Sequence, residues 1–242
     1  MTTAYTNDYP VIIALLLVAI LTIRFRNLTI PAACTAFVMA WLIFAGTGFV
    51  GLIMLGTFFL LGTGVTAFKK EAKIDPGTAQ MPATTRNTGQ VWANGGVAAL
   101  MALLCLLLPG KRETFTILLA ASLASATADT LSSELGTVFG KRFFNILSFR
   151  SDRKGLDGVV SLEGTLAGAL GAAAIAAIYL AFNNYSGKIA IIITAGIVGN
   201  LADSILGATL ERRGYIGNDT VNFLNTLIAA AVAFALLLAC SY

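Results

Sequence analysis

The sequence contains no histidine and little charge, and both shortages limit the chemistry and the fold that it can support. Without histidine, there is no imidazole to act as a general base or as a metal ligand. Any bound metal would be held by oxygen ligands, which favours magnesium. Charged residues make up 12% of the chain and hydrophobic residues 57%, whereas soluble domains carry about 25% charged residues. The composition therefore excludes an ordinary soluble domain.

Cysteine and short nucleotide-binding motifs are also scarce. The three cysteines, Cys34, Cys105 and Cys240, lie in apolar runs without CxxC spacing, which is typical of packing residues. The first ten residues contain no lysine or arginine, so we interpret the first apolar stretch as a retained span and not as a signal peptide. The chain has no GxxxxGK[ST] run, so a P-loop is not expected.

What the chain does contain is a series of continuous apolar stretches, each close to the length that crosses a bilayer as a helix. We expect an all-α, polytopic integral membrane bundle that forms a single transmembrane domain over 1–242, with its catalytic part at about 65–230. The eight predicted spans are 7–23, 28–45, 49–68, 91–108, 115–132, 159–182, 188–208 and 220–240.

The basic residues predict how the chain sits in the membrane. Of the sixteen lysines and arginines, all but Lys111, Arg112 and Lys188 fall in the first, third, fifth and seventh linkers between the predicted spans. By the positive-inside rule, these four linkers are cytoplasmic and both termini lie outside. We expect the plasma (inner) membrane as the location.

Acidic residues occur where lipid-facing side chains are expected. Asp129 lies inside the fifth predicted span, in the run ATADTLSSELGTVFGK (126–141), and Glu134 follows it. An ionisable residue at membrane depth is a functional-site hypothesis by default. A shorter copy of the pattern, ADS around Asp203, occurs later in the chain, either as a weak internal repeat or by chance. We predict that Asp129 and Asp203 face each other across one site.

Other polar residues fall on the same predicted membrane face. Glycine-rich turns at helix starts can offer backbone N–H groups to phosphate, and carboxylates can hold Mg²⁺ against phosphate oxygens. The pattern therefore indicates phosphoryl or nucleotidyl transfer. Each residue also has a structural reading: the buried acids as hydrogen-bonded packing groups, Asp219 as a helix cap, and Asn222 and Asn225 as contacts between helices.

Several motifs resemble a known membrane family, the one that contains plant phytyl phosphate kinase. The runs that carry the resemblance are KKEA (69–72), GTAQ (77–80), RNTGQVWANG (86–95), DTLSSELG (129–136), VSLEGTLA (160–167), DSILGATL (203–210) and NDTVNFLN (218–225). More distantly, the series DTLSSELG, FGK (139–141) and SLEGT (161–165) is similar to CTP-using polyprenol kinases and phosphatidate cytidylyltransferases.

The resemblance implies an isoprenyl (phytyl or polyprenyl) phosphate kinase that uses Mg²⁺ and a nucleoside triphosphate, either CTP or ATP. The implied catalytic residues are Asp129, Glu134 and Asp203, and Asp219 joins them as a metal ligand. The nucleotide- and phosphate-binding candidates are Lys69, Arg86, Asn87, Asn94, Lys141, Ser161, Glu163, Gly164, Thr165, Asn218, Asp219, Asn222 and Asn225. The expected partners are the lipid and the nucleotide, with no nucleic acid and with a homodimer left open.

Three alternatives stay open at this point. One is a CTP-dependent lipid alcohol kinase or cytidylyltransferase. Another is a membrane transporter, in which paired intramembrane acids also occur. The third is a scaffold without chemistry.

Overall fold

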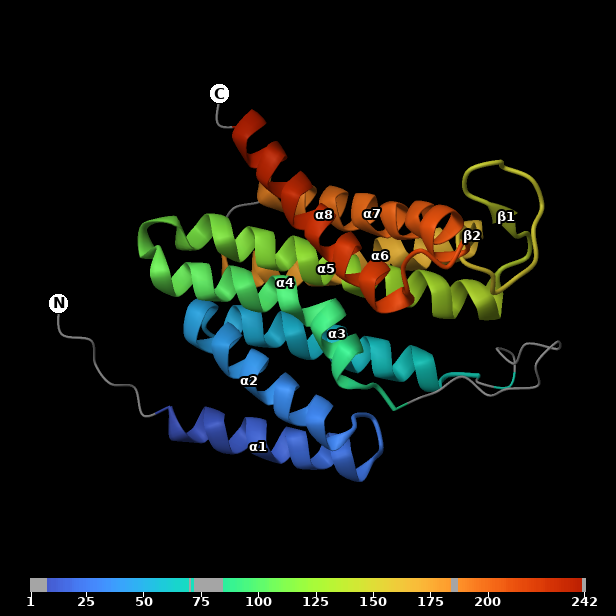
Figure 1. The fold of residues 1–242 in the computed structure, drawn as a ribbon. Coiled ribbons are helices and arrows are strands. Elements are labelled where there is room, and N and C mark those ends of the chain that lie inside the picture. The colour runs from blue at the N-terminus through green and yellow to red at the C-terminus, as the bar shows by residue number, and fades with distance from the viewer. Residues whose placement is uncertain (1–7, 70, 72–84, 184–186, 241–242) are drawn as a thin grey trace.

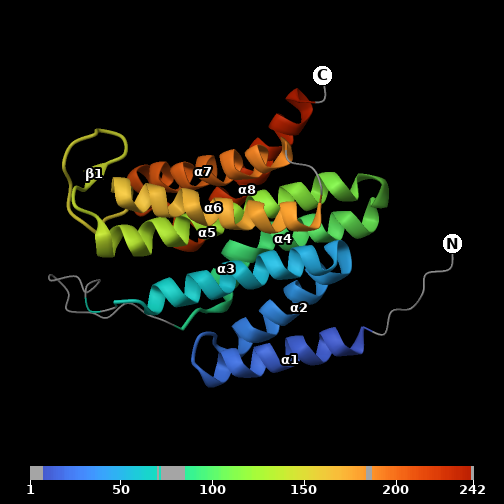
Figure 2. The same ribbon diagram turned by 180° about the vertical axis from the view of Figure 1, so that it is seen from behind.

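The computed structural model describes residues 8–69, 71, 85–183 and 187–240. Within them, eight long helices form one bundle (Figures 1 and 2). They are α1 (Tyr9–Arg24), α2 (Ile30–Thr47), α3 (Phe49–Ala67), α4 (Thr88–Leu107), α5 (Arg112–Phe139), α6 (Leu162–Phe182), α7 (Gly187–Leu206) and α8 (Asn218–Ala239). All except α1 are long and apolar enough to cross a membrane. The predicted fold class, a polytopic helical membrane bundle, is confirmed.

The centre of the bundle is α5, which packs against α3, α4, α6, α7 and α8. Small side chains allow this crowding: Ala120, Ala121 and Ala124 are fully buried, and in membranes small residues let helix backbones approach closely. Helix α1 lies at the edge and packs chiefly against α2 (Figure 1). The arrangement leaves α1 at the edge, whereas Ile43 of α2 and Met54 and Phe58 of α3 belong to the core that is built around α5.

The predicted spans match the helices within a few residues, except at the end of the fifth. We expected that span to stop at 132, but α5 continues to Phe139. Its hydroxyl side chains donate to its own backbone: Ser133 Oγ to Asp129 O at 3.0 Å and Thr137 Oγ1 to Ser133 O at 2.7 Å. Because these groups are satisfied within the helix, the helix extends through a polar stretch and carries Glu134 on its surface.

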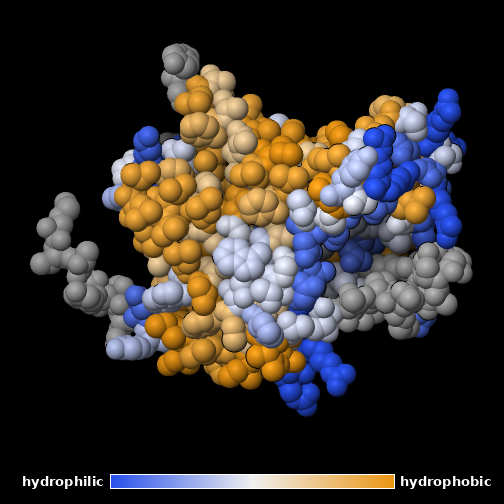
Figure 3. All heavy atoms as spheres, in the orientation of Figure 1, coloured by the Kyte–Doolittle hydropathy of each residue, from blue (hydrophilic) through white to orange (hydrophobic). Residues whose placement is uncertain are grey.

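One end of the bundle is polar and elaborate. The ends of α3, α5 and α7 and the starts of α4, α6 and α8 meet there, next to a two-stranded antiparallel sheet of β1 (Phe144–Asn145) and β2 (Val159–Val160). Hydrophilic residues gather at this end in Figure 3, whereas apolar side chains cover most of the rest of that face. Of the family-like runs, GTAQ (77–80) and all of KKEA (69–72) except Lys69 and Glu71 lie outside the described residues.

Candidate active site

A cavity of about 350 Å³ lies in the polar end of the bundle. Its lining includes five carboxylates, namely Asp129, Glu134, Asp157, Asp203 and Glu211. Among the lining residues that the structure describes, Arg86 is the single basic side chain. Hydroxyl and amide groups from α4, α5, α7 and α8 fill most of the remaining wall. A cavity with this excess of negative charge favours cations.

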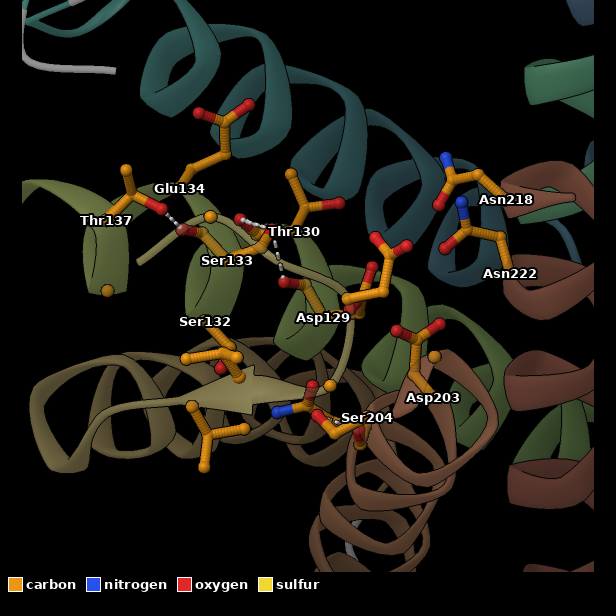
Figure 4. A pocket seen from close by; sticks show the side chains of 18 of the residues that line it. Asp129, Thr130, Ser132, Ser133, Glu134, Thr137, Asp203, Ser204, Asn218 and Asn222 are labelled. Carbon is orange, nitrogen blue, oxygen red and sulfur yellow. Dashed lines mark hydrogen bonds between the residues drawn. The ribbon is translucent and has the colours of Figure 1, made fainter. Parts of the chain in front are cut away.

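Asp129 and Asp203 approach each other from two different helices. Figure 4 shows both carboxylates directed into the same space, Asp129 from α5 and Asp203 from α7. Both carboxylates line this cavity, where each lies within the electrostatic influence of the other. The predicted convergence of the two acids at one end of the bundle is therefore what the structure shows.

A buried hydrogen-bond network fixes the position of Asp203. Asn225 Nδ2 of α8 donates to Asp203 Oδ1 at 2.7 Å, and Ser125 Oγ of α5 donates to Asn225 Oδ1 at 3.1 Å. Ser125 and Asn225 are both completely buried. Three helices thus hold one carboxylate, and Asn225 acts on the cavity through Asp203 without lining it.

Two glycines allow the helices to come this close. A β-carbon at Gly199 of α7 would overlap the Ser125 hydroxyl of α5. A β-carbon at Gly168 of α6 would lie 2.8 Å from Ala128 O and 2.7 Å from Asn200 Nδ2, which is closer than β-carbons pack. The small residues next to the acidic pair therefore set the spacing of α5, α6 and α7 around it.

Arg86 is held in place by its backbone. Its N–H donates to Asn27 O at 2.8 Å, and its carbonyl accepts from the N–H of Thr29 at 3.1 Å. The guanidinium carbon lies 5.7 Å from the centre of the Phe58 ring, a cation–π distance. Burial lowers the pKa of Arg86, and the negative charge of Glu134 acts in the opposite direction. Arginine stays protonated in proteins, so the cavity has a fixed positive charge.

Polar groups of three further helices complete the wall. Ser161 caps α6 by accepting from Gly164 N at 3.1 Å, and it also lines the cavity. Asn94 Nδ2 donates to Gln90 O at 2.9 Å within α4. Figure 4 shows Asn218 and Asn222 of α8 pointing toward the acidic pair. Of the predicted site residues, the cavity brings together Arg86, Asn94, Asp129, Glu134, Ser161, Asp203, Asn218 and Asn222.

The other predicted site residues do not line the cavity, and most have structural contacts. Lys69 Nζ lies 5.4 Å and 5.2 Å from the ring centres of Phe68 and Phe139. Asn87 caps α4 in a reciprocal pair with Gln90. The lining leaves out Lys69, Asn87, Lys141, Glu163, Gly164, Thr165, Asp219 and Asn225.

Contacts at the start of α6 explain why most of the SLEGT run, which was predicted to bind phosphate, does not line the cavity. Glu163 Oε2 accepts from Lys141 N at 3.4 Å, and Thr165 Oγ1 donates to Ser161 O at 3.0 Å. A β-carbon at Gly164 would lie 2.6 Å from Ser132 O, so this glycine serves the contact between α6 and α5. The SLEGT run builds the helix junction, and of its five residues Ser161 lines the cavity, next to Gly158, Val159 and Val160 of the turn before it.

The sequence analysis did not predict two acidic residues of the cavity, Asp157 and Glu211. Asp157 lies in the segment that leads into β2, and Glu211 ends η3, a π-helical turn (Gly207–Glu211) that follows α7. Gly158, with a φ of 71°, packs directly against Ala208 and folds that segment onto η3. Glu211 comes eight residues after Asp203, and positions i and i+8 belong to one broad face of a helix. That spacing is the signal that could have identified Glu211.

The metal ligands predicted as a set of four are not assembled. Glu134 extends toward α3 in Figure 4, and Asp219 at the start of α8 packs against Gly89 instead. In the part of the chain that the structure describes, no three His, Cys, Asp or Glu residues are grouped closely enough to hold a metal ion. Mg²⁺ usually takes one or two protein carboxylates together with substrate phosphates and waters. The Asp129–Asp203 pair fits that requirement.

Comparison with known proteins supports the resemblance that the motifs indicated. The profile of the family "Integral membrane protein DUF92" matches residues 13–230. The chain belongs to the DUF92 family. Its curated relatives include "Uncharacterized membrane protein MJ0933" of Methanocaldococcus jannaschii, which is 38% identical over 81% of this chain and 79% of the relative. "Uncharacterized membrane protein sll0875" of Synechocystis is 32% identical over 83% of this chain and 79% of the relative.

A plant protein is a more distant relative of this DUF92 chain. "Protein VTE6, chloroplastic" of Arabidopsis thaliana is 27% identical over 86% of this chain and 64% of its own length. No solved structure matches the chain. The family match reaches from α1 into α8 and includes every residue of the cavity wall. The cavity therefore lies entirely within the region that defines the DUF92 family.

Proposed function

We propose that this DUF92 protein is an isoprenyl-phosphate kinase that converts a lipid monophosphate to the diphosphate. An oxygen of the lipid phosphate attacks the terminal phosphorus of a nucleoside triphosphate, the bond to the bridging oxygen breaks, and the nucleoside diphosphate leaves. The observation that carries the proposal is the meeting of Asp129 and Asp203 in a cavity that also contains Arg86. The distant relationship to VTE6 supports it, because VTE6 is the plant phytyl phosphate kinase of the family that the motifs resemble.

Asp129 and Asp203 would hold Mg²⁺ in this site. When bound, Mg²⁺ would supply positive charge against the negative charge of the transferred phosphoryl group. Asn225 keeps the Asp203 carboxylate in place by its 2.7 Å hydrogen bond. Without a cation, the five lining carboxylates would repel a triphosphate, so the nucleotide is expected to enter as its magnesium complex.

Arg86 would bind the phosphate of the lipid. Arginine suits this role because its planar guanidinium pairs with two phosphate oxygens at once. The backbone hydrogen bonds to Asn27 and Thr29 fix the backbone of Arg86 just before the start of α4, so little backbone motion is needed when the phosphate binds. Ser161, Asn218 and Asn222 supply further donors in the cavity wall.

The orientation follows from the charge distribution. The cavity lies at the bundle end where most lysines and arginines of the predicted cytoplasmic linkers occur. We therefore infer a cytoplasmic site in the plasma membrane, with both termini outside. Nucleotide would then reach the cavity directly from the cytoplasm.

The test is a transfer assay on purified protein in liposomes. Labelled ATP and CTP are offered with phytyl monophosphate, geranylgeranyl monophosphate and the two free alcohols, with and without Mg²⁺. We expect magnesium-dependent formation of the diphosphates from the monophosphates. Reaction of the free alcohols alone would contradict the proposal and favour a lipid alcohol kinase, and transfer of the cytidylyl group would favour a cytidylyltransferase.

A further inference from the structure

A second cavity, of about 510 Å³, lies among α1, α2, α3 and α4. Its wall is apolar and contains many small residues, such as Ala36 and Ala40 of α2 and Gly56 of α3. The volume falls within the range of about 300–1,000 Å³ that is typical of ligand sites. The space exists because α1 packs chiefly against α2 and leaves room beside α3.

The two cavities share part of their walls. Arg86, Gln90 and Asn94 line both of them. These three residues are polar, whereas the rest of the second cavity is almost wholly apolar, with the hydroxyl of Thr22 satisfied by Ala19 O at 2.8 Å. The apolar space therefore leads directly to the one guanidinium of the acidic cavity.

We propose that the apolar cavity, which we call the chain groove, holds the isoprenoid chain of the substrate while Arg86 binds its phosphate. This inference rests on the proposed function and adds the place where the lipid is recognised. A single-chain lipid phosphate matches both halves: a hydrocarbon in an uncharged slot and an anion at its polar end. Burial of the chain in the slot would fix the distance between its phosphate and Asp129, and the length of the slot would limit the chains accepted.

Gly56 offers a way to shorten the chain groove without disturbing the helix. A β-carbon at Gly56 meets nothing within 4 Å, and the residue lines the groove. Gly62, which packs against the Arg86 guanidinium, lies six residues further along α3, about 9 Å along the helix axis. A phenylalanine at Gly56 would therefore block the groove beyond the first isoprene units of a bound chain.

The matched control is Gly64 on the same helix. A β-carbon at Gly64 also meets nothing within 4 Å, but this residue lines neither cavity. We expect Gly56→Phe to reduce kcat/KM for geranylgeranyl monophosphate by at least about tenfold while dimethylallyl monophosphate reacts as in the wild type. Gly64→Phe should leave both values unchanged. Equal losses for the long and the short chain, or equal effects of the two variants, would overturn the inference.

A binding measurement separates the chain groove from the kinase. Geranylgeranyl monophosphate with a photoreactive diazirine at the chain end is irradiated with the wild type and both variants in liposomes, and the labelled peptides are identified by mass spectrometry. We expect label on α1, α2 or α3 in the wild type and in Gly64→Phe, and its loss in Gly56→Phe. Label without transfer would overturn the kinase and keep the groove. Transfer with label only on α6 to α8 would keep the kinase and overturn the groove, and label that an excess of unlabelled ordinary phospholipid removes would show general lipid contact only.

Discussion

The two halves of α5 are made of similar residues but have different surroundings. Every residue from Thr116 to Ala128 is buried, and the first half packs against helices on all sides. From Asp129 to Phe139, most residues are only partly buried, and several line the acidic cavity. Hydroxyl groups occur in both halves. In the first half they are enclosed in the core, and in the second they face the cavity.

The difference teaches that the site is made by an interruption in packing. Alanine and glycine bring the neighbours of α5 close along its first half. Along the second half, α6 stays close through Gly164 at Ser132, and the cavity opens beside Asp129 and Ser133. A carboxylate is costly inside a packed membrane bundle, but it is tolerated where helices part around a polar cavity. We therefore expect changes in the first half to affect stability and changes in the second half to affect chemistry.

The largest expected effect is loss of transfer in Asp129→Asn. The amide keeps the size of the side chain but removes the negative charge that the proposed metal requires, so kcat should fall by at least about a hundredfold. Glu113→Gln, in the first turn of the same helix at the opposite end of the bundle, is the matched control and should keep its activity. Liposome transfer assays and thermal unfolding of both variants check this. Asp129→Asn protein that is folded and fully active would contradict the proposed role of the acidic pair.

The next effect is on stability, in Ala124→Leu. Ala124 is completely buried, and a β-carbon on the facing Gly196 of α7 would already lie 2.9 Å from the Ala124 β-carbon. Overpacking of this kind costs about 1–3 kcal/mol, so the midpoint of thermal unfolding in detergent should fall. The control is Ala45→Leu on α2, where the side chain is exposed and no loss is expected. If both variants unfold at the wild-type temperature, the first half of α5 is less tightly packed than described.

A smaller effect is expected for Asn225→Ala. The Asn225 side chain connects the packed half of α5 to the cavity. Asn225 accepts from Ser125 in the packed half and donates to Asp203 in the cavity. Hydrogen bonds between membrane helices contribute about 0.6 kcal/mol on average and up to about 1.7. Loss of a bond to a charged group should lower transfer by about tenfold. Asn183→Ala, which removes a bond to Tyr179 O at the other end of α6, should leave transfer unchanged.

A positioning role for Asn225 makes a distinct kinetic prediction. Because Asp203 would be misplaced, the apparent affinity for Mg²⁺ should weaken in Asn225→Ala, and high Mg²⁺ should restore part of the rate. A loss of activity that follows only the loss of folded protein, with unchanged magnesium dependence, would make Asn225 a purely structural residue.

The comparison of the two halves also shows what the sequence could predict. The spans and the acidic pair were accessible because apolar length and an intramembrane carboxylate are local signals. The segment between α5 and α6 was not, because Gly158 and Asp157 reach the cavity only by folding against Ala208, a contact between distant parts of the chain. Likewise, the GT of the SLEGT run suggested phosphate binding, yet Gly164 packs on α5. A glycine that serves a helix contact and one that serves a phosphate look the same in a sequence.

The smallest expected effect concerns the segment between α5 and α6, which lies beside the second half of α5. Arg212 Nη1 donates to Asp152 Oδ2 at 3.0 Å and ties this segment to the end of η3. The backbone N–H of Arg153, and after it the Arg212 side chain, hold the pKa of Asp152 below its usual value. A depressed pKa means that the contribution to stability is present above the unfolded-state pKa of about 3.9 and is lost as the pH falls through the lower, folded value. Since surface ion pairs are weak and screened by salt, the effect should be small.

Asp152→Asn should therefore unfold at a slightly lower temperature than the wild type at neutral pH, and the difference should shrink both in high salt and as the pH is lowered past 4. Arg212→Gln should give a smaller difference, because it leaves the hydrogen bond from Arg153 N–H to Asp152 in place. In the double variant it should add nothing to Asp152→Asn, because the contact between Asp152 and Arg212 is already lost. A gap that is unchanged in acid, or single effects that add in the double variant, would show that Asp152 acts through another group. In that case the segment between α5 and α6 would be held by the packing of Gly158 on Ala208, and its ion pair would not contribute to stability.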